Sequence, residues 1–531
     1  MKRERVYKKT PSTLLTALRR LCRVFFSRYA ISALIIVAEV VLMTFLILRL
    51  SYDPGVTSYV TLGTVVIPGL IAFILVVNRD ANPEYKVTWT AIVLLLPVFG
   101  ALIYFLFYNR RMTRGESMRL RGVFSEIRSY RSTEVLDELR AVDSLAAGKA
   151  QAIMAEDYIS EVYRDTVSSF FPSGESYFES LISDLSSARS YIFLEYFIIE
   201  QGELWDSVHE ILKQKAAEGL DVRLLYDDIG CMRTLPSNYE HLLRSEGIKA
   251  FRFAKVSPRV TAAHNNRDHR KICIVDGAVG YTGGVNIADE YVNRRLRFGH
   301  WKDGGIRLSG SAVAGLAKLF LSAWDFTTGT VSDYESVLSS VKPHTKGDGG
   351  FYLPFGSGPS PIYKRPVGKN LFMNLINQAE RYIYVTTPYL IIDYDLTEAL
   401  CNAAVRGVDV RIITPHIADK RIVKIMTKSS YPHLMESGVK IFEYTPGFIH
   451  EKTLVVDGLY AVVGTLNFDW RSFVHHFEDG VWMYRTPTVD VARAEFDKTL
   501  EKCEKIDSRK SRLTFLEWIF RNGIKLFAPL L

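Results

Sequence analysis

Cysteine is scarce in this sequence of 531 residues, and no two cysteines are spaced as a C-x-x-C pair. Because their number is odd and they are scattered, they argue against both a disulfide scaffold and a cysteine-based zinc site. No cluster of carboxylates or histidines has the spacing of metal ligands either. We therefore expect no metal and no other cofactor. The five cysteines are Cys22, Cys231, Cys273, Cys401 and Cys503.

Acidic residues are fewer than basic ones, 58 against 66, which leaves a formal net charge of +8. The basic excess is concentrated near the N-terminus, before and after a set of apolar stretches. This distribution suits an anionic lipid surface or a phosphate-bearing substrate, although solvated charge alone gives the same total. The chain is also too long for one ordinary core, so we expect membrane segments followed by two catalytic lobes.

Polar residues are nearly absent from three stretches near the N-terminus. The first runs from Ala30 to Leu48 and is interrupted by Glu39, and the others run from about Tyr59 to Val77 and from about Val87 to Tyr108. About 20 apolar residues cross the hydrocarbon core of a bilayer. A cleaved signal peptide or buried core helices fit stretches of this length less well. We predict a basic segment at 1–29 and a membrane region at 30–109 with two or three transmembrane helices.

The topology of this region is less determined than its spans. Aromatic residues near the ends of the third stretch, Trp89, Tyr104 and Tyr108, suit interfacial anchoring. An odd number of crossings places the basic segments 1–29 and 110–150 on opposite sides of the membrane, although the arginines of the second favour a cytoplasmic catalytic region. Either the N-terminus lies outside despite its charge, or the stretch containing Glu39 does not fully cross.

Beyond a basic linker at 110–150, the pattern is that of an α/β protein that contains one unit twice. A strand at 191–199, a helix at 204–218 and a strand at 222–226 are matched by a strand at 382–386, a helix at 395–406 and a strand at 410–413. The junctions read A-E-G-L-D-V-R-L-L-Y and A-V-R-G-V-D-V-R-I-I-T. We predict α/β lobes at 151–345 and 346–531, the second with a C-terminal helix that packs on it or lies on a membrane surface.

Each copy continues into the motif H-x-K-x-x-x-x-D. Side chains alternate along a strand, so the histidine and the lysine share one face. A single pair is weak evidence, but the recurrence of the full spacing predicts chemistry. Imidazole suits attack on phosphorus and proton transfer at neutral pH, and lysine suits binding of phosphate oxygens. The members are His269, Lys271 and Asp276 in the first lobe and His450, Lys452 and Asp457 in the second.

Further polar residues complete the predicted site. Asn286, Asn467 and Thr465 follow the motifs as neutral hydrogen-bond donors. Asp303 and Glu478, each about one strand and turn beyond a motif, are the carboxylates that we expect to orient the imidazoles, with a solvated acid as the alternative. The motif aspartates count among the catalytic residues, but their odd offset from the histidines places them at the far end of the strand, where they fix the strand end or a lobe interface.

These motifs resemble the phospholipase D superfamily and, within it, the bacterial cardiolipin synthases. The likeness rests on N-R-D-H-R-K-I-C-I-V-D-G with T-G-G-V-N-I-A-D-E-Y, and on G-F-I-H-E-K-T-L-V-V-D-G with V-G-T-L-N-F-D-W-R-S-F. It implies two tandem α/β repeats packed as one pseudo-symmetric catalytic unit, in which both histidines face one phosphodiester. Thr465 stands where the family usually has serine, His476 where it commonly has asparagine, and the stretch at 30–48 exceeds its usual pair of membrane helices.

The resemblance implies transfer of a phosphatidyl group from one phosphatidylglycerol to another, which forms cardiolipin and glycerol through a phosphohistidine. We assign His269 as the nucleophile and His450 as the general acid and then base, an order that the similarity of the motifs leaves open. The implied partners are phosphatidylglycerol and anionic lipids of a bacterial cell membrane. We expect this protein to cross that membrane several times and to hold its catalytic lobes on the cytoplasmic side. No nucleic acid is expected, and the sequence does not specify an oligomeric state.

Three other functions remain open. A membrane phospholipase D, or a phosphatidyltransferase with a different acceptor, would use the same residues, because water and lipid hydroxyls attack alike. A nuclease of the superfamily would assign the basic charge to nucleic acid, but the apolar stretches argue against it. A membrane scaffold with a decayed site is disfavoured by two intact motifs.

Overall fold

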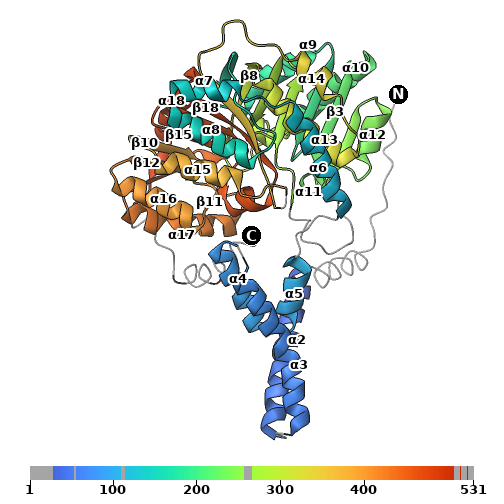
Figure 1. Cartoon of the computed structure of the whole chain (residues 1–531), viewed down its shortest axis with the longest axis vertical. Coiled ribbons are helices and arrows are strands. Elements are labelled where there is room, and N and C mark those ends of the chain that lie inside the picture. The colour runs from blue at the N-terminus through green and yellow to red at the C-terminus, as the bar shows by residue number, and fades with distance from the viewer. Residues whose placement is uncertain are drawn as a thin grey trace, which may run out of the picture. The chain divides into compact units, whose positions relative to one another are not determined.

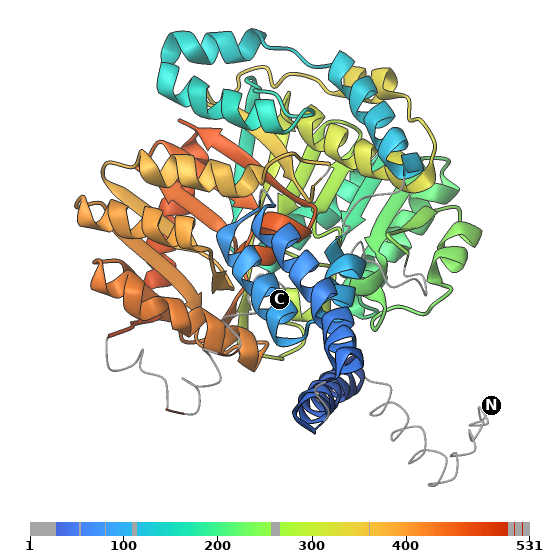
Figure 2. The ribbon, with the colours of Figure 1, turned by 60° about the horizontal axis from the view of Figure 1, so that its bottom comes forward.

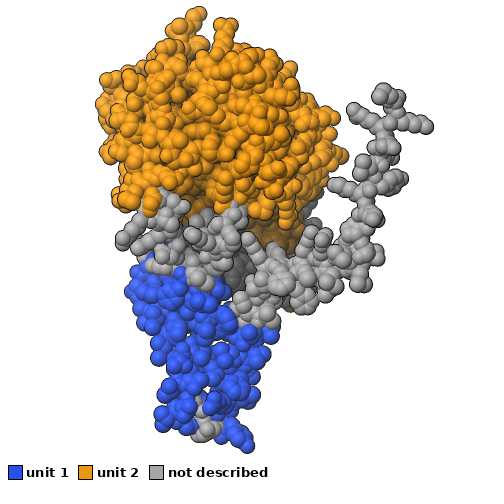
Figure 3. Space-filling view, turned by 90° about the vertical axis from the view of Figure 1, so that its right-hand side faces the viewer, with its two compact units in different colours: residues 1–109 blue, residues 110–531 orange. Residues whose placement is uncertain are grey.

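The computed structural model describes residues 28–52, 55–79, 81–108, 114–255, 266–360 and 362–507, with Phe515 and Gly523. The chain divides into two compact units, residues 1–109 and 110–531, which are coloured separately in Figure 3. Two predicted features lie almost wholly outside the described residues, namely the basic segment 1–29 and the C-terminal helix.

The N-terminal unit consists of helices in its described part (Figure 1). Their bounds are α2 (Arg28–Tyr52), α3 (Val56–Val77), α4 (Pro83–Leu95) and α5 (Phe99–Tyr108). Among the fully described helices, one stretch, Tyr59–Val77 in α3, is long and apolar enough to cross a membrane. It coincides with the second predicted span.

The third apolar stretch is not one continuous helix, contrary to the prediction. It divides into α4 and α5 around Pro97, whose ring removes a backbone N–H and disfavours a continuing helix. Trp89 of α4 packs edge-to-face on Tyr104 of α5, with ring centroids 5.3 Å apart. Both rings are buried inside the unit, so their predicted role as interfacial anchors is wrong. The two helices instead fold back on each other as a hairpin, visible in Figure 1.

The segment 110–150, predicted as a basic linker, is also corrected by the structure. It contains α6 (Arg114–Ser129) and α7 (Glu134–Val142) and most of α8 (Ser144–Glu156), which pack on the α/β lobes. In α6 the buried residues Leu120, Val123 and Ile127 recur every three or four positions and form an apolar stripe. The segment therefore belongs to the second compact unit, residues 110–531.

The first lobe is built on a seven-stranded sheet of order β1-β8-β6-β5-β2-β3-β4. β2, β3 and β4 run parallel to one another, and the other neighbours pair antiparallel. The strands are β1 (Thr166–Phe171), β2 (Tyr191–Tyr196), β3 (Asp221–Asp227), β4 (Lys249–Phe253), β5 (Lys271–Val275), β6 (Val279–Gly283) and β8 (Gly305–Gly310). The helices are α9 (Gly174–Ser187), α10 (Glu203–Ala217), α11 (Asp228–Cys231), α12 (Tyr239–Ser245), η2 (Asp289–Val292), α13 (Val313–Thr328) and α14 (Tyr334–Ser340).

The second lobe repeats this arrangement in a sheet of order β9-β18-β16-β15-β10-β12-β13-β19. Position by position it matches the first sheet read from β1, with β19 added at the far edge, which confirms the predicted α/β repeat. The strands are β9 (Phe351–Ser357), β10 (Tyr382–Thr386), β12 (Asp409–Pro415), β13 (Lys440–Tyr444), β15 (Thr453–Val456), β16 (Tyr460–Gly464), β18 (Glu478–Tyr484) and β19 (Cys503–Lys505). The helices are α15 (Val367–Asn377), α16 (Tyr394–Val405), α17 (Arg421–Glu436), η3 (Arg471–His475) and α18 (Pro487–Leu500).

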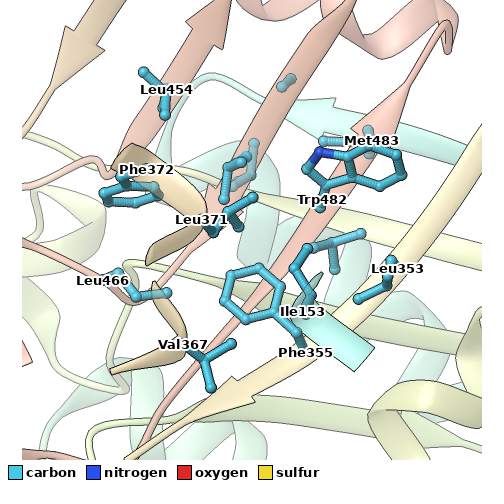
Figure 4. Close-up of a cluster of buried hydrophobic side chains, with 14 of the residues drawn as sticks. Ile153, Leu353, Phe355, Val367, Leu371, Phe372, Leu454, Leu466, Trp482 and Met483 are labelled. Atoms are coloured by element: carbon cyan, nitrogen blue, oxygen red, sulfur yellow. The ribbon is translucent and has the colours of Figure 1, made fainter. Parts of the chain in front are cut away.

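The two sheets lie side by side and share a hydrophobic core that runs through both lobes (Figure 2). Figure 4 shows part of this core, where Ile153, Phe355, Leu371 and Trp482 gather from α8, β9, α15 and β18. A short parallel pair, β7 (His300–Lys302) with β14 (Gly447–Ile449), joins one lobe to the other. A second parallel bridge pairs Asp268 with Phe477. These two junctions lead directly into the histidines of the motifs. Paired β11 (Leu390–Ile391) and β17 (Phe468–Asp469) complete the strands.

Candidate active site

His269 lies two residues before the start of β5, at a junction between the lobes. Its backbone N–H donates to the carbonyl oxygen of Phe477, at 2.8 Å. Its ring Nδ1 lies 2.8 Å from Oε2 of Glu478, the first residue of β18. Burial lowers the pKa of His269 to about 3, so the ring is neutral at pH 7. With Nδ1–H donated to the carboxylate, Nε2 keeps the lone pair that a nucleophile needs.

His450 occupies the corresponding place in the second lobe, between β14 and β15. Its backbone N–H donates to the carbonyl oxygen of Lys302, at 2.7 Å, and its ring Nδ1 lies 2.6 Å from Oδ2 of Asp303. The other carboxylate oxygen of Asp303 accepts the backbone N–H of Gly304, at 2.9 Å. Burial and the ammonium of Lys452 lower the pKa of His450 to about 4, so this ring is also neutral.

Each imidazole is thus held by a carboxylate from the opposite lobe. Glu478 of the second lobe contacts His269 of the first, and Asp303 of the first contacts His450 of the second. Both acids were expected to orient imidazoles, and both make such a hydrogen bond. Burial opposes ionisation of Asp303, but Lys452 and His450 lower its pKa below the ordinary value. Each lobe therefore needs the other to complete its half of the site.

The motif lysines are buried beside the histidines. Nζ of Lys271 donates to the carbonyl oxygen of His269 at 2.5 Å, and Nζ of Lys452 lies 2.8 Å from Nδ1 of His450. Burial lowers the pKa of Lys271 to about 8 and that of Lys452 to about 7. An added anion would favour the charged form of both, so the pair is suited to receive a phosphate.

The motif aspartates, predicted among the catalytic residues, contact neither histidine. The carboxylate of Asp276 accepts the backbone N–H groups of three successive residues, Arg189, Ser190 and Tyr191, at 2.7 to 2.8 Å. Asp457 does the same for Glu380, Arg381 and Tyr382, at 2.8 to 2.9 Å. Both aspartates also have positive φ, 54° and 58°. They tie the end of one strand to the start of its neighbour, as their odd offset from the histidines indicated.

The predicted neutral donors are mostly engaged by the protein itself. Oδ1 of Asn286 accepts the backbone N–H of Ile198 at 3.0 Å, and its Nδ2 donates to the hydroxyl of Tyr291 at 2.7 Å. The hydroxyl of Thr465 donates to Oε2 of Glu478, and the backbone N–H of Asn467 donates to Oγ of Ser472 at 3.1 Å. Asn286 and Thr465 therefore support groups that touch the histidines.

Several residues of the site were not found from the sequence. Tyr291, Trp301 and Phe448 surround the ring of His450, with centroids 5.5 to 5.7 Å away. The carboxylate of Asp479 accepts a hydrogen bond from the hydroxyl of Thr282, at 2.5 Å. Burial raises the pKa of Asp479 to about 7. The only sequence signal for Asp479 is its position next to Glu478. Tyr291 lies in η2, and Trp301 and Phe448 lie in β7 and β14, where burial alone explains an aromatic residue.

His476 is the other residue that sequence reasoning underrated. It follows the π-helical turn η3, and its ring centroid lies 5.4 Å from that of His269. Ligand atoms of His269, His476 and Glu478 all lie within 4.8 Å of one another. The expectation that no such cluster exists came from spacing along the chain, and His269 is 209 residues from Glu478.

The arrangement as a whole suits transfer at a phosphodiester. It offers two neutral imidazoles, each held by an ionised carboxylate, and two buried lysines that would face the charge of a phosphate. One imidazole can bond to phosphorus while the other transfers a proton.

Comparison with known protein families agrees with this chemistry. Residues 181–297 and 372–500 match the family described as "Cardiolipin synthase, PLD-like domain", and residues 67–107 match the "Phospholipase_D-nuclease N-terminal" family. A cardiolipin synthase of Halalkalibacterium halodurans is 34% identical over 90% of this chain and 94% of its own length. The chain belongs to the cardiolipin synthase family of phospholipase D-like proteins. It is therefore a phosphatidyltransferase.

Other relatives cover most of the chain as well. A cardiolipin synthase of Alkalihalophilus pseudofirmus is 33% identical over 91% of the chain and 95% of its own length. An uncharacterized protein of Streptococcus mutans is 37% identical over 86% and 98%. Among solved structures, a phosphatidylserine synthase of Haemophilus influenzae aligns with a TM-score of 0.53 at 14% identity, covering 72% of this chain and 100% of that one. At that identity the likeness shows the fold.

Proposed function

We propose that the protein is a cardiolipin synthase that uses phosphatidylglycerol as both donor and acceptor. The observation that carries this proposal is the pair of neutral imidazoles, His269 and His450, each hydrogen-bonded to a carboxylate of the opposite lobe. The relatives named cardiolipin synthase support the choice of reaction.

In the first half of the reaction, Nε2 of His269 attacks the phosphorus of the donor phosphatidylglycerol. A P–N bond forms, and the bond from phosphorus to the glycerol headgroup oxygen breaks. His450 in its protonated form donates its proton to that oxygen, which leaves as glycerol. The negative phosphate favours protonation of His450 on binding, and the ionised Glu478 stabilises the positive charge that develops on His269.

In the second half, a second phosphatidylglycerol enters with its terminal hydroxyl. The now neutral His450 takes the proton of that hydroxyl, whose oxygen attacks phosphorus while the P–N bond breaks. Cardiolipin leaves, and both histidines return to their starting states. Lys271 and Lys452 offset the charge on the non-bridging oxygens throughout.

The alternative is a membrane phospholipase D or a phosphatidyltransferase with a different acceptor. The same residues would then pass the phosphatidyl group to water or another alcohol. Purified protein in detergent micelles with phosphatidylglycerol distinguishes these outcomes. We expect equal amounts of cardiolipin and free glycerol, lost in His269→Ala and His450→Ala. Phosphatidic acid as the sole lipid product would replace the synthase with a hydrolase.

For the membrane region, we infer two crossings, by α2 and α3, and a re-entrant pair, α4 and α5. These last helices have 13 and 10 residues. At 1.5 Å per residue, each is about 20 Å long or less, whereas the hydrocarbon core is about 30 Å thick. Neither is therefore long enough to cross alone, and their hairpin brings the chain back to the side from which it entered.

The turn between α4 and α5 lies against the middle of α2 and α3. The buried carboxylate of Glu39, in mid-α2, accepts the backbone N–H groups of Val98 and Phe99, at 2.9 and 2.8 Å. Gly69, in mid-α3, packs so tightly on the turn that a Cβ there would lie 2.7 Å from Cβ of Pro97. Non-helical backbone is tolerated at this depth only where protein groups satisfy it, and Glu39 supplies that partner.

This arrangement removes the conflict between the two basic segments. With two crossings and a re-entrant pair, residues 1–29 and 110–150 both lie on the cytoplasmic side, as positive charge in short flanking segments favours. Neither an external N-terminus nor an incomplete crossing of the stretch with Glu39 is then required.

A further inference from the structure

His476 is a buried histidine whose ring nitrogens are not satisfied by hydrogen bonds in the described part of the chain. Its side chain is 8% exposed, and within the described part of the chain neither ring nitrogen has a hydrogen-bond partner. The distance of 3.7 Å from Nδ1 of His476 to Oε1 of Glu478 is too long for a hydrogen bond. That carboxylate oxygen also lacks a partner among the described residues. Buried groups of this kind are costly unless something binds them.

The unpartnered atoms of His476 and Glu478 lie beside His269, whose ring centroid is 5.4 Å from that of His476. His269, His476 and Glu478 are all buried, and one ligand atom from each lies within 4.8 Å of the others. Two imidazoles and one carboxylate form the ligand set of open zinc sites, in which the fourth position holds water. Tetrahedral coordination brings ligand atoms to about 3.4 Å from one another, so no pair of them needs to approach by more than about 1.4 Å. Phe197 packs on both imidazole rings, at 4.9 and 6.3 Å, and limits how far they turn away.

We propose that His269, His476 and Glu478 bind a divalent transition metal such as Zn²⁺. The binding itself does not depend on the reaction that the enzyme catalyses. Its consequence rests on the proposed function. A metal ion bound to His269 and Glu478 occupies the imidazole that would attack phosphorus and the carboxylate that supports it. The bound ion therefore inhibits the transferase, and a chelator restores the activity.

The chain offers a matched control for this site. Glu398, Cys401 and His433 form a second cluster of possible ligands on α16 and α17, with Nε2 of His433 2.9 Å from Oε1 of Glu398. His433 is partly exposed, so adventitious metal would reach it more easily. His476→Asn and His433→Asn each remove one imidazole and keep a polar side chain of similar size.

The experiment titrates Co²⁺ into the purified full chain in detergent, because tetrahedral Co²⁺ with nitrogen ligands absorbs visible light. We expect one equivalent to bind to wild type and to His433→Asn, with the band abolished by Zn²⁺, and at least a tenfold weaker affinity in His476→Asn. Circular dichroism checks that each variant is folded, and His476→Gln replaces the first variant if it is not. Equal affinity in wild type and His476→Asn, loss in His433→Asn instead, or no band at all would each overturn the site.

Inhibition is measured separately on the same samples. We expect Zn²⁺ to inhibit lipid turnover by wild type at the same midpoint concentration at which it displaces Co²⁺. For His476→Asn, inhibition is expressed as a fraction of that variant's own uninhibited rate. The midpoint concentration of Zn²⁺ should then be at least tenfold higher than for wild type. Cobalt binding without inhibition would keep the site and refute the regulatory consequence. A product other than cardiolipin would refute the proposed function and leave the metal site standing, because the absorption measurement does not involve turnover.

Discussion

His269 and Glu478 stand 209 positions apart and in different lobes, yet Nδ1 of the histidine lies 2.8 Å from Oε2 of the carboxylate. His450 and Asp303 make the reverse pairing across the same interface. The two exchanged hydrogen bonds assign different tasks to the two acids. If His269 bonds to phosphorus, Glu478 supports the nucleophile. Asp303 then supports the group that protonates the leaving oxygen.

Replacing each acid by its amide tests this division. Glu478→Gln and Asp303→Asn keep the shape of the side chain but remove its charge, and each is expected to lower kcat on the order of 10³-fold with phosphatidylglycerol. A donor with a nitrophenyl group in place of glycerol needs no proton on its leaving oxygen. We therefore expect nitrophenol release to return to within about tenfold of wild type in Asp303→Asn and to stay low in Glu478→Gln. A stopped-flow absorbance measurement follows nitrophenol release in both variants.

The same donor distinguishes the two histidines. His450→Ala should release one nitrophenol per enzyme molecule and retain the phosphatidyl group covalently bound to His269, whereas His269→Ala should do neither. The reverse pattern would make His450 the nucleophile and would also exchange the roles of the two acids. Glu179→Ala, an exposed acid on α9, serves as a control for handling and folding.

Substrate affinity is expected to depend on pH through the motif lysines. Burial lowers the pKa of Lys452 to about 7 and that of Lys271 to about 8. Both groups are charged at lower pH and lose their protons as pH rises through these values. A bound phosphate favours the ammonium, so the Kd of an unreactive lipid phosphonate should be constant below about pH 6.5 and rise by up to about tenfold per unit above pH 7.

Lys452→Arg provides the matched variant for this titration. A guanidinium stays charged throughout this range, so the lower of the two transitions should disappear. Binding to micelles, measured by fluorescence, reports the Kd without turnover. An unchanged pH profile in Lys452→Arg would assign the titration to another group.

Asp276 and Asp457 are expected to affect stability more than catalysis. Each accepts three backbone N–H groups at the end of a neighbouring strand, and each has positive φ. Asp276→Ala removes the acceptor and also strains an alanine in the left-handed region, so we expect a loss of about 1–3 kcal/mol in unfolding free energy. Thermal melting checks this. Activity per folded molecule, assayed well below the melting temperature, should remain within about threefold of wild type. A fall of 10²-fold or more without loss of stability would restore the aspartate to the catalytic residues.

The duplicated fold could be predicted because its signals are local. The apolar runs of β2 and β10 and the spacing of the motif are visible in short windows, and alternation along a strand was enough to place Asp276 away from the imidazole. The helix α6 could have been found in the same way, since Leu120, Val123 and Ile127 have helical spacing. Its arginines instead led to the prediction of a linker.

Asp303 and Glu478 were predicted as the carboxylates that orient the imidazoles. Their exchange between the lobes and the approach of His476 to His269 could not be predicted, because contacts between lobes leave no pattern along the chain. The helix break at Pro97 has a similar cause. A membrane helix often tolerates proline, so composition alone favours one long span. What decides the matter is Glu39, 59 residues before Val98, whose backbone N–H donates to the carboxylate of Glu39. A hydropathy pattern does not contain that interaction.

The proposed re-entrant pair of α4 and α5 leads to a prediction about membrane sidedness. We expect Lys86→Cys, at the start of α4, and Met118→Cys, in α6, to react from the same side, and Tyr52→Cys, at the end of α2, to react from the other. Labelling with a membrane-impermeant maleimide in intact spheroplasts and in lysed ones measures the three accessibilities, in a background in which Cys22 is replaced by serine. If α4 and α5 crossed as one span, Met118→Cys would react from the side of Tyr52→Cys.

Glu39→Gln should retain the arrangement of α4 and α5, because an amide oxygen still accepts hydrogen bonds from the turn between them. Glu39→Leu leaves the N–H groups of Val98 and Phe99 without their carboxylate and should lower the yield of folded protein.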